Sequence, residues 1–379
     1  MNILFCGTWV PEIIEYRIKN ISAAGNRFQN NMICNLKALG HEVDVISYIS
    51  IEIPEELKIE FLDGGSSNRD NIIKHFCILR ENGGSMATLQ SVKKCKKTVR
   101  ELISKYDVIL CYNVFYSFFF LPKMAKRFQK KNILILADYS GVESYHSIKN
   151  KLYAGMQMWV MRQYDMVVGL SANIQKKIKP DQQFLLMEGG IDENFYNRFS
   201  EKSSRNKEKV IFMYSGLLSK VTGVDILLQA VTEINEKGFE LWISGKGYLE
   251  QQVCEASKRD NRICYLGHME YNEYIETLKK VDVLINPRNM SLPENQNNFP
   301  SKIMDYLATG KDILSSKFVG WEKFDENIIF YDDENMLKDE MEKYICGRYI
   351  IGENYKKNRK LAIDFLWKNQ LKRIFGDEL

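Results

Sequence analysis

Short apolar runs alternate with helix-like stretches along almost the whole chain, and this alternation limits its possible folds more than any other feature. The runs are nearly continuous in Val, Ile and Leu, as expected for strands buried on both faces of a sheet. Alternating strands and helices predict right-handed βαβ units and doubly wound parallel sheets. The predicted strands lie at 2–9, 42–48, 107–113, 132–139, 166–171 and 184–189, and then at 210–216, 239–245, 263–268, 281–287, 312–316 and 328–331.

Length and a local change in composition predict two α/β domains. A chain of 379 residues is too long for one ordinary core. The charged stretch EKSSRNKEK at 201–209 lacks apolar periodicity, which favours a linker nearby. We therefore predict one domain over 1–195 and a second over 196–355, with 356–379 forming an amphipathic helix that packs back on the first domain.

Composition argues against several classes of protein. A content of 45% hydrophobic and 27% charged residues is typical of a globular chain, and no apolar run approaches the roughly 20 residues of a membrane span. The N-terminus enters a strand-like run without a basic leader, so no signal peptide is expected. Eight cysteines and four histidines are scattered, which favours reduced thiols and no metal. A net charge of +4 gives no argument for nucleic acid.

The segment NNFPSKIMDYLATGKDILSS at 297–316 predicts a turn, a short helix and a new strand. It follows a strand, where doubly wound sheets bind ligands. Ser301 is a good N-cap after the extended Pro300, and the amides of the first turn suit an anion such as a diphosphate. One turn on, Asp305 could accept hydrogen bonds from two neighbouring hydroxyls, as on a ribose. The same residues are explained equally well without a ligand, as a capped helix whose acid near the N-terminus interacts favourably with the helix dipole.

Several segments together resemble retaining glycosyltransferases of the GT-B fold, in particular family 4, which builds capsular and other bacterial polysaccharides. They are SAAGNRFQNNMICNLKALGHEVDVIS (22–47), LMEGGIDENFY (186–196), YSGLLSKVTGVDILLQA (214–230), LWISGKGYLEQQ (241–252) and FPSKIMDYLATGK. The resemblance implies two Rossmann-like domains facing a cleft, the first for the acceptor and the second for a nucleotide sugar. It further implies a cytoplasmic, metal-independent hexosyltransferase without a cofactor that uses a UDP sugar and a glycan or lipid-linked glycan acceptor.

In that family two acids separated by seven residues hold the nucleotide sugar. The second acid falls on Asp305 and the first on Asn297, whose amide can bind hydroxyls but cannot stabilise a developing positive charge. Glu294 is a nearby alternative. The loop between the two positions would present its backbone to the sugar and phosphates, and it consists of Asn298, Phe299, Pro300 and Ser301.

The family's Arg and Lys that hold the diphosphate are replaced here by Leu217 and Thr222. Arg288 is our first candidate to replace them, because a guanidinium at a strand end can hold two phosphate oxygens. Lys302 and then Lys220 follow, although each cation is also explained as a solvated surface group. Two glycines bracket a turn where the backbone approaches a ligand or another strand, namely Gly216 and Gly223.

The acceptor side is expected in the first domain. Gly25 matches the family's glycine loop near the diphosphate, followed by Asn26 and Arg27. An Arg at a helix start is unfavourable unless it serves a ligand or partner. Asp138 and Glu143 follow a strand and could orient or deprotonate the acceptor hydroxyl; Glu143 reads more simply as a loop acid. The catalytic candidates are thus Asp138, Asn297 and Arg288.

Two basic segments raise the question of membrane contact. Residues 93–105 contain six basic residues and one acid, and 116–132 join aromatic to basic residues. The composition of segment 116–132 suits contact with an anionic membrane, such as the inner face of the plasma membrane. A solvated helix face explains the charge as well.

Two other functions remain open for a chain with this resemblance. The first is a non-catalytic GT-B partner of an active transferase, which the replaced acid and cations allow. The second is a sugar-nucleotide epimerase, which the scattered histidines disfavour.

Overall fold

The computed structural model describes residues 1–11, 22–49, 66–68, 71–73, 75–79, 84–139, 141–202 and 208–376. The chain forms two compact units, Met1–Gly190 with Trp367–Leu379 and Ile191–Leu366. The chain therefore passes from the first unit to the second after Gly190 and returns after Leu366. The linker predicted at 201–209 lies partly outside the described residues.

The first unit is built on a seven-stranded parallel sheet with the order β5-β2-β1-β6-β7-β8-β9. Its strands are β1 (Asn2–Gly7), β2 (Glu42–Ile49), β5 (His75–Leu79), β6 (Val108–Tyr112), β7 (Lys131–Leu136), β8 (Met166–Gly169) and β9 (Gln183–Leu186). A separate antiparallel pair joins β3 (Ser66–Asn68) to β4 (Asn71–Ile73). All six strands predicted here are present. Strand β5 lies outside the prediction because only a short apolar run, 76–79, follows a polar stretch.

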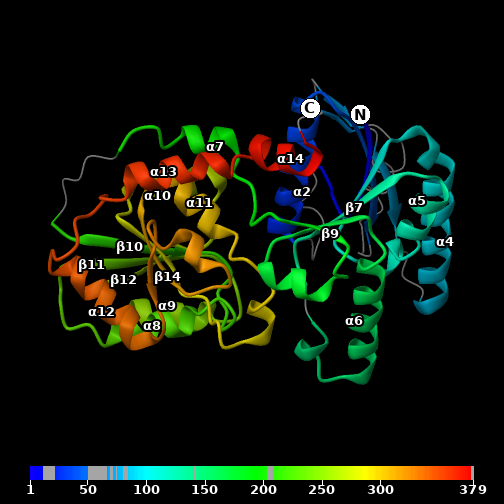
Figure 1. The fold of residues 1–379 in the computed structure, drawn as a ribbon. Helices are drawn as coiled ribbons and strands as arrows, with labels where there is room; N and C mark the ends of the chain where they lie inside the picture. The colour runs from blue at the N-terminus through cyan, green and yellow to red at the C-terminus, as the bar shows by residue number, and fades with distance from the viewer. Residues whose placement is uncertain are drawn as a thin grey trace. The chain divides into compact units, whose positions relative to one another are not determined.

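Helices cover both faces of this sheet. Helices α4 (Gly84–Leu102), α5 (Leu121–Arg127) and α6 (Ile148–Met161) share one core, in which Cys95, Leu121 and Met161 are fully buried. Helices α2 (Ala23–Ala38) and α14 (Trp367–Phe375) pack together on the other face, as Figure 1 shows.

The second unit is built on a six-stranded parallel sheet with the order β12-β11-β10-β13-β14-β15. Its strands are β10 (Val210–Ser215), β11 (Phe239–Ser244), β12 (Ile263–Tyr265), β13 (Val283–Asn286), β14 (Asp312–Ser316) and β15 (Ile329–Tyr331). Each corresponds to a predicted strand. The strand order reverses between β10 and β13, which is the point where doubly wound sheets bind ligands.

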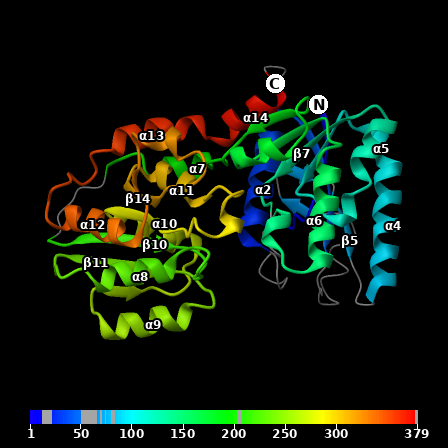
Figure 2. The same ribbon diagram turned by 60° about the horizontal axis from the view of Figure 1, so that its bottom comes forward.

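Helices also cover both faces of the second sheet (Figures 1 and 2). One group is α8 (Val224–Thr232), α9 (Glu250–Arg259) and α12 (Glu334–Ile345). The other is α7 (Glu193–Asn197), α10 (Tyr271–Lys280), α11 (Lys302–Thr309) and α13 (Tyr355–Asp364). In the part of the chain that the structure describes, no helix is both long enough and apolar enough to span a bilayer.

The C-terminal tail contains two helices where the sequence predicts one. Helix α13 ends at Asp364 and α14 begins at Trp367. The backbone amide of Ile191 donates to the carbonyl of Phe365 in the break between them, at 2.7 Å. Helix α13 packs against α11 in the second unit, and α14 packs against α2 in the first. The tail is therefore divided between the units.

Candidate functional site

The carboxyl edge of the second sheet contains two loops whose backbones touch. The loop after β10 begins at Gly216, and the loop after β11 contains Gly245 and Gly247. A Cβ on Gly245 would overlap the carbonyl oxygen of Gly216, and a Cβ on Gly247 would overlap that of Leu218. Glycine is required because the two loops approach each other directly. This contact explains the GKG sequence at 245–247 without a ligand.

Gly223, in the loop after β10, packs against the backbone of the loop after β13. Its backbone is left-handed (φ +74°), and a Cβ there would overlap the carbonyl oxygen of Pro287. The amide of Asn289 donates to the carbonyl of Val221 at 3.3 Å. These contacts fix the loop after β13 and therefore set the position of Arg288.

Lys302, at the start of α11, lies over the end of β10. Its Nζ is 3.9 Å from the centre of the Tyr214 ring and 2.7 Å from where a Cβ on Gly216 would lie, so the glycine leaves space for the ammonium. Burial, and then the neighbouring Arg288 guanidinium, lower the pKa of Lys302 to about 7, against the opposing effect of Asp305. Two cations that repel each other in this way favour a bound anion.

Asn295 holds Arg288 in place. It is fully buried and accepts a hydrogen bond from Nε of Arg288 at 2.6 Å. Its own amide donates to the carbonyls of Val221 at 2.9 Å and Asn289 at 2.6 Å. Burial raises the pKa of Tyr214, and Arg288 opposes that rise. The guanidinium therefore acts on the same small region as Lys302.

The first turn of α11 differs from the sequence prediction at Ser301. Ser301 has helical backbone angles (φ −52°, ψ −27°), and its hydroxyl caps no amide. The amides of Ile303 and Met304 bond to the carbonyls of Pro300 and Ser301. Within the described residues the amides of Ser301 and Lys302 have no acceptor, which leaves two donors at a helix N-terminus for a ligand or water.

The two positions matched to the family's acids lie at and just before this turn. Asp305 is half-buried in the first turn of α11 and acts electrostatically on Lys302. Asn297 is only 5% exposed, and its side chain forms no hydrogen bond to the residues that the structure describes. A buried amide without such a bond is suited to a polar ligand group.

The rest of the loop is held by its own side chains. Nδ2 of Asn298 donates to the carbonyl of Glu294 at 2.8 Å. Phe299 is 7% exposed and packs edge-on against Phe318, with ring centres 5.1 Å apart. Its aromatic ring therefore belongs to the core, and only the backbone of Phe299 is suited to a ligand.

Lys220 does not join the two other predicted cations. It is exposed, and its backbone amide donates to the hydroxyl of Tyr248 at 2.7 Å. The hydroxyl of Thr222 donates to the carbonyl of Leu217 at 2.6 Å, while the Leu217 side chain is 59% exposed. Thr222 thus shapes the turn.

In the first unit, the residues at the start of α2 have different roles. Ser22 caps the helix by accepting a hydrogen bond from the amide of Gly25 at 3.1 Å. Asn26 is buried and forms two hydrogen bonds with the backbone of Val10, both 2.9 Å, so it fixes the loop after β1. Arg27 is exposed.

Asp138 lies at the carboxyl edge of the first sheet, beside the end of β6. The side chain of Asn113 accepts hydrogen bonds from the amides of Ala137 and Asp138 at 2.8 and 3.1 Å, and Asn113 itself has a left-handed backbone (φ +55°). Burial, and then Asp138, raise the pKa of Tyr112. The hydroxyl of Tyr112 is 3.1 Å from where a Cβ on Gly25 would lie, so these residues share one region.

Glu143 lies in a short 3₁₀ turn, Val142–Ser144, five residues before the start of α6 at Ile148. Among the described residues, no group of three or more His, Cys, Asp or Glu side chains could hold a metal ion. Two adjacent acids late in the sequence, Asp332 and Asp333, have structural roles: Asp332 forms an ion pair with Lys317 at 3.0 Å, and Asp333 caps α12.

Two residues of this site were not among the candidates from sequence. Tyr214 supplies the ring beneath Lys302, and Asn295 anchors Arg288. Neither has a sequence signal of its own, because a tyrosine in a buried strand and an asparagine in a polar loop are both ordinary.

Comparison with known proteins agrees with this architecture. Residues 208–346 match the family described as Glycosyl transferases group 1. No curated protein sequence matches the chain. Solved structures that superpose on it include HepE from Anabaena in complex with UDP, with 15% identity, a TM-score of 0.70 and 100% of both chains covered. The lipopolysaccharide outer core galactosyltransferase WaaB gives 13% identity and a TM-score of 0.69 over 99% of both chains.

Sucrose-phosphate synthase from Thermosynechococcus elongatus gives 12% identity and a TM-score of 0.70 over 99% of this chain and 97% of that one. Likeness at such identities concerns the fold alone. The chain therefore has the GT-B fold, with two parallel-sheet α/β units of seven and six strands.

Proposed function

We propose that the protein is a glycosyltransferase that moves a hexose from a nucleotide sugar, a UDP sugar, to a glycan or lipid-linked glycan. One observation carries this proposal. Lys302 lies beside Gly216, the charge of Arg288 acts on it, and both cations belong to the same edge of the sheet as the uncapped start of α11. Two cations and two backbone donors provide what a diphosphate leaving group needs. The family match over 208–346, and HepE solved with UDP and with UDP and glucose, support the same donor.

Each candidate residue has a proposed role in this reaction. Lys302 and Arg288 stabilise the departing diphosphate, Asp305 accepts hydrogen bonds from the ribose, and Asn297 hydrogen-bonds the transferred sugar. In the first unit, Asp138 orients the acceptor hydroxyl or takes its proton. Transfer proceeds with retention of the anomeric configuration and without a metal ion, because cations of the chain carry the charge of the leaving group.

The proposed setting is polysaccharide biosynthesis, such as that of a capsule, an exopolysaccharide or an O-antigen, at the cytoplasmic face of the membrane. The basic segments 93–105 and 116–132 would supply charge for membrane contact. The aromatic residues of the second segment are not exposed: Phe118 is 1% exposed, and its neighbours pack against the core. Insertion into lipid must therefore use other side chains.

A non-catalytic role is the second candidate. Asn297 replaces an acid, and the hydroxyl of Thr222 is used within its own turn. A GT-B partner subunit that stabilises an active transferase would need neither group.

A thermal-shift panel of UDP, GDP, ADP and their hexose derivatives separates the two. Ligand that binds only the folded state raises the melting temperature by mass action. We expect a rise with UDP and UDP sugars that is lost in Lys302→Met and Asp305→Ala. Lys258→Met and Asp339→Ala, at exposed positions on α9 and α12, are matched controls and should keep the rise. No shift with any nucleotide would reject the donor site and favour the partner subunit.

A further inference from the structure

Helix α6 of the first unit exposes a stripe of large apolar side chains. Ile148 is 78% exposed, Leu152 66%, Met156 54% and Trp159 61%. Their spacing of four, four and three residues puts them on one face, about 17 Å long at 1.5 Å per residue. Large side chains exposed together in this way mark an interaction surface.

The opposite face of α6 is fixed to the unit. Val160 and Met161 are buried in the core that α4 and α5 share. The Tyr153 ring stacks on Phe119 with centres 6.0 Å apart, and Nε2 of Gln157 donates to the carbonyl of Val114 at 2.8 Å. The helix cannot rotate to bury its stripe without losing these contacts, so the stripe needs a partner outside the unit.

The charges on α6 are all positive. Between Ile148 and Arg162 there is no Asp or Glu. At 3.6 residues per turn, Lys149 falls on one flank of the stripe, whereas Lys151 and Arg162 fall on the other. An apolar face with cationic flanks and a Trp is the pattern of a helix that lies in the interface of an anionic membrane.

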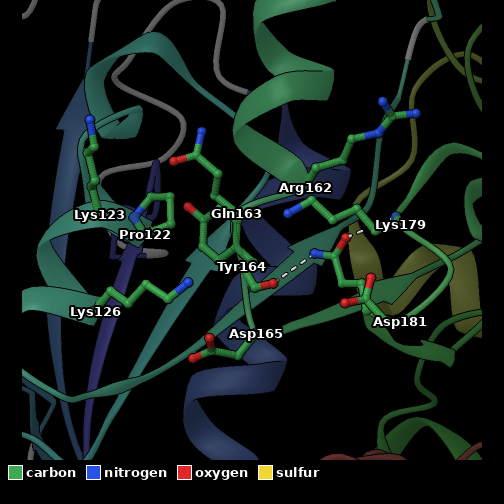
Figure 3. A pocket seen from close by; sticks show the side chains of 10 residues that line it. Pro122, Lys123, Lys126, Arg162, Gln163, Tyr164, Asp165, Lys179 and Asp181 are labelled. Carbon is green, nitrogen blue, oxygen red and sulfur yellow. Dashed lines mark hydrogen bonds between the residues drawn. The ribbon is translucent and has the colours of Figure 1, made fainter.

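A basic pocket lies at the C-terminal end of α6 (Figure 3). It has a volume of about 220 Å³, and four cations line it, from α5, the end of α6 and the segment before β9: Lys123, Lys126, Arg162 and Lys179. Two acids also line it, Asp165 and Asp181. Asp165 accepts hydrogen bonds from the backbone and side-chain amides of Asn132.

Among the residues that the structure describes, the four cations of this pocket are not paired with its two acids. Within the described residues none of the four forms an ion pair. Arg162 is half-buried and donates from Nε to the carbonyl of Lys177 at 2.9 Å, which orients the guanidinium and leaves its two terminal nitrogens for another acceptor. A phosphate-sized anion meets the charge and donor pattern of such a pocket.

We propose that α6 docks the first unit on an anionic lipid bilayer, with the stripe in the interface and the pocket around a lipid phosphate. This proposal identifies α6 as the element that makes the membrane contact named under the proposed function, and it does not depend on glycosyl transfer itself. The alternative occupant of the stripe is a second copy of the chain. Packing two such stripes against each other would bring Lys149 and Lys151 near like charges, which disfavours that pairing.

Vesicle flotation tests the proposal with phosphatidylcholine vesicles and with the same vesicles containing a quarter phosphatidylglycerol. The full chain should bind the anionic vesicles and bind the neutral ones weakly, with affinity falling as salt rises. Leu152→Ser with Trp159→Ser should lower affinity by about tenfold or more. Ile350→Ser, at a position 70% exposed in the second unit, should bind as the wild type does.

Two further variants test whether Trp159 enters the bilayer and whether the cations of the pocket recognise lipid charge. Vesicles should shift the tryptophan emission of the wild type to the blue, and Trp159→Phe should abolish that shift. Of the four other tryptophans, Trp9 and Trp367 are buried, and Trp242 and Trp321 lie in the second unit. Lys126→Gln with Lys179→Gln should reduce the preference for phosphatidylglycerol. The proposal fails if the wild type does not float with anionic vesicles or if the stripe variant floats equally well. It also fails if sedimentation velocity shows a dimer that the stripe variant abolishes without any vesicle binding.

Discussion

Binding of a UDP sugar should draw a proton onto Lys302. Burial and the neighbouring Arg288 hold the pKa of its ammonium at about 7, and a diphosphate with about two negative charges would raise it again. With a free pKa of about 7, the group carries only about a tenth of a proton at about pH 8, so saturation with UDP-glucose should take up about 0.9 proton there. At about pH 6 the group is already charged, and uptake should fall to about 0.1.

Titration calorimetry in buffers of different ionisation enthalpy measures the number of protons taken up on binding directly. Affinity should be constant below about pH 7 and should weaken by up to about tenfold per pH unit above it, until the pKa of the bound state is reached. UDP-glucose is preferable to UDP, because a terminal phosphate ionises near pH 6 itself. Lys302→Arg keeps the charge and should remove the uptake. A wild type whose affinity does not change with pH, or equal uptake in the Arg variant, would refute the reasoning.

Three other perturbations follow from contacts of the second unit. Gly223→Ala should lower the free energy of unfolding in denaturant titration by at least about 2 kcal/mol, because the new Cβ meets the carbonyl of Pro287; unchanged stability would contradict the observed backbone. Asn295→Ala should weaken UDP-glucose binding more than about tenfold in calorimetry, since it releases Arg288. Burial raises the pKa of Asp312 from 3.8 to about 6, so ionising it costs stability above pH 6 and costs none below its ordinary pKa. Asp312→Asn should therefore raise the free energy of unfolding at about pH 7 by as much as about 3 kcal/mol and leave it unchanged near pH 4; an equal effect at both pH values would count against that pKa.

The fold was predictable because strands buried in a parallel sheet have continuous apolar sequences. The strand 210–216 needs no neighbour to be recognised, and the same holds for 132–139. Strand β5 could not be recognised in this way, because its apolar run is short and its place at the edge of the sheet depends on pairing with β2. The break at Phe365 and Leu366 coincides with the hydrogen bond from Ile191, a contact between distant segments that no local pattern encodes.

The candidate site was less visible in the sequence than the fold. Arg288 and Lys302 were predicted from the sequence as cations that hold the diphosphate, and in the structure the charge of Arg288 acts on Lys302. Their surroundings depend on contacts between distant segments, such as the Tyr214 ring under Lys302. The predicted cap at Ser301 fails because its backbone is already helical, and a side-chain preference alone cannot fix backbone angles. The exposed stripe of α6 has the composition of a buried helix, so burial itself had to be known before it could be recognised.

Hydrogen exchange measured by mass spectrometry, with and without saturating UDP-glucose, tests the central claim most directly. If the carboxyl edge of the second sheet holds the diphosphate, peptides covering 214–223, 286–289 and 298–303 should exchange more slowly with ligand. Lys302→Met should remove that protection under the same conditions. Protection confined to other peptides, or no protection at a concentration that saturates binding, would contradict the assignment of this edge as the donor site.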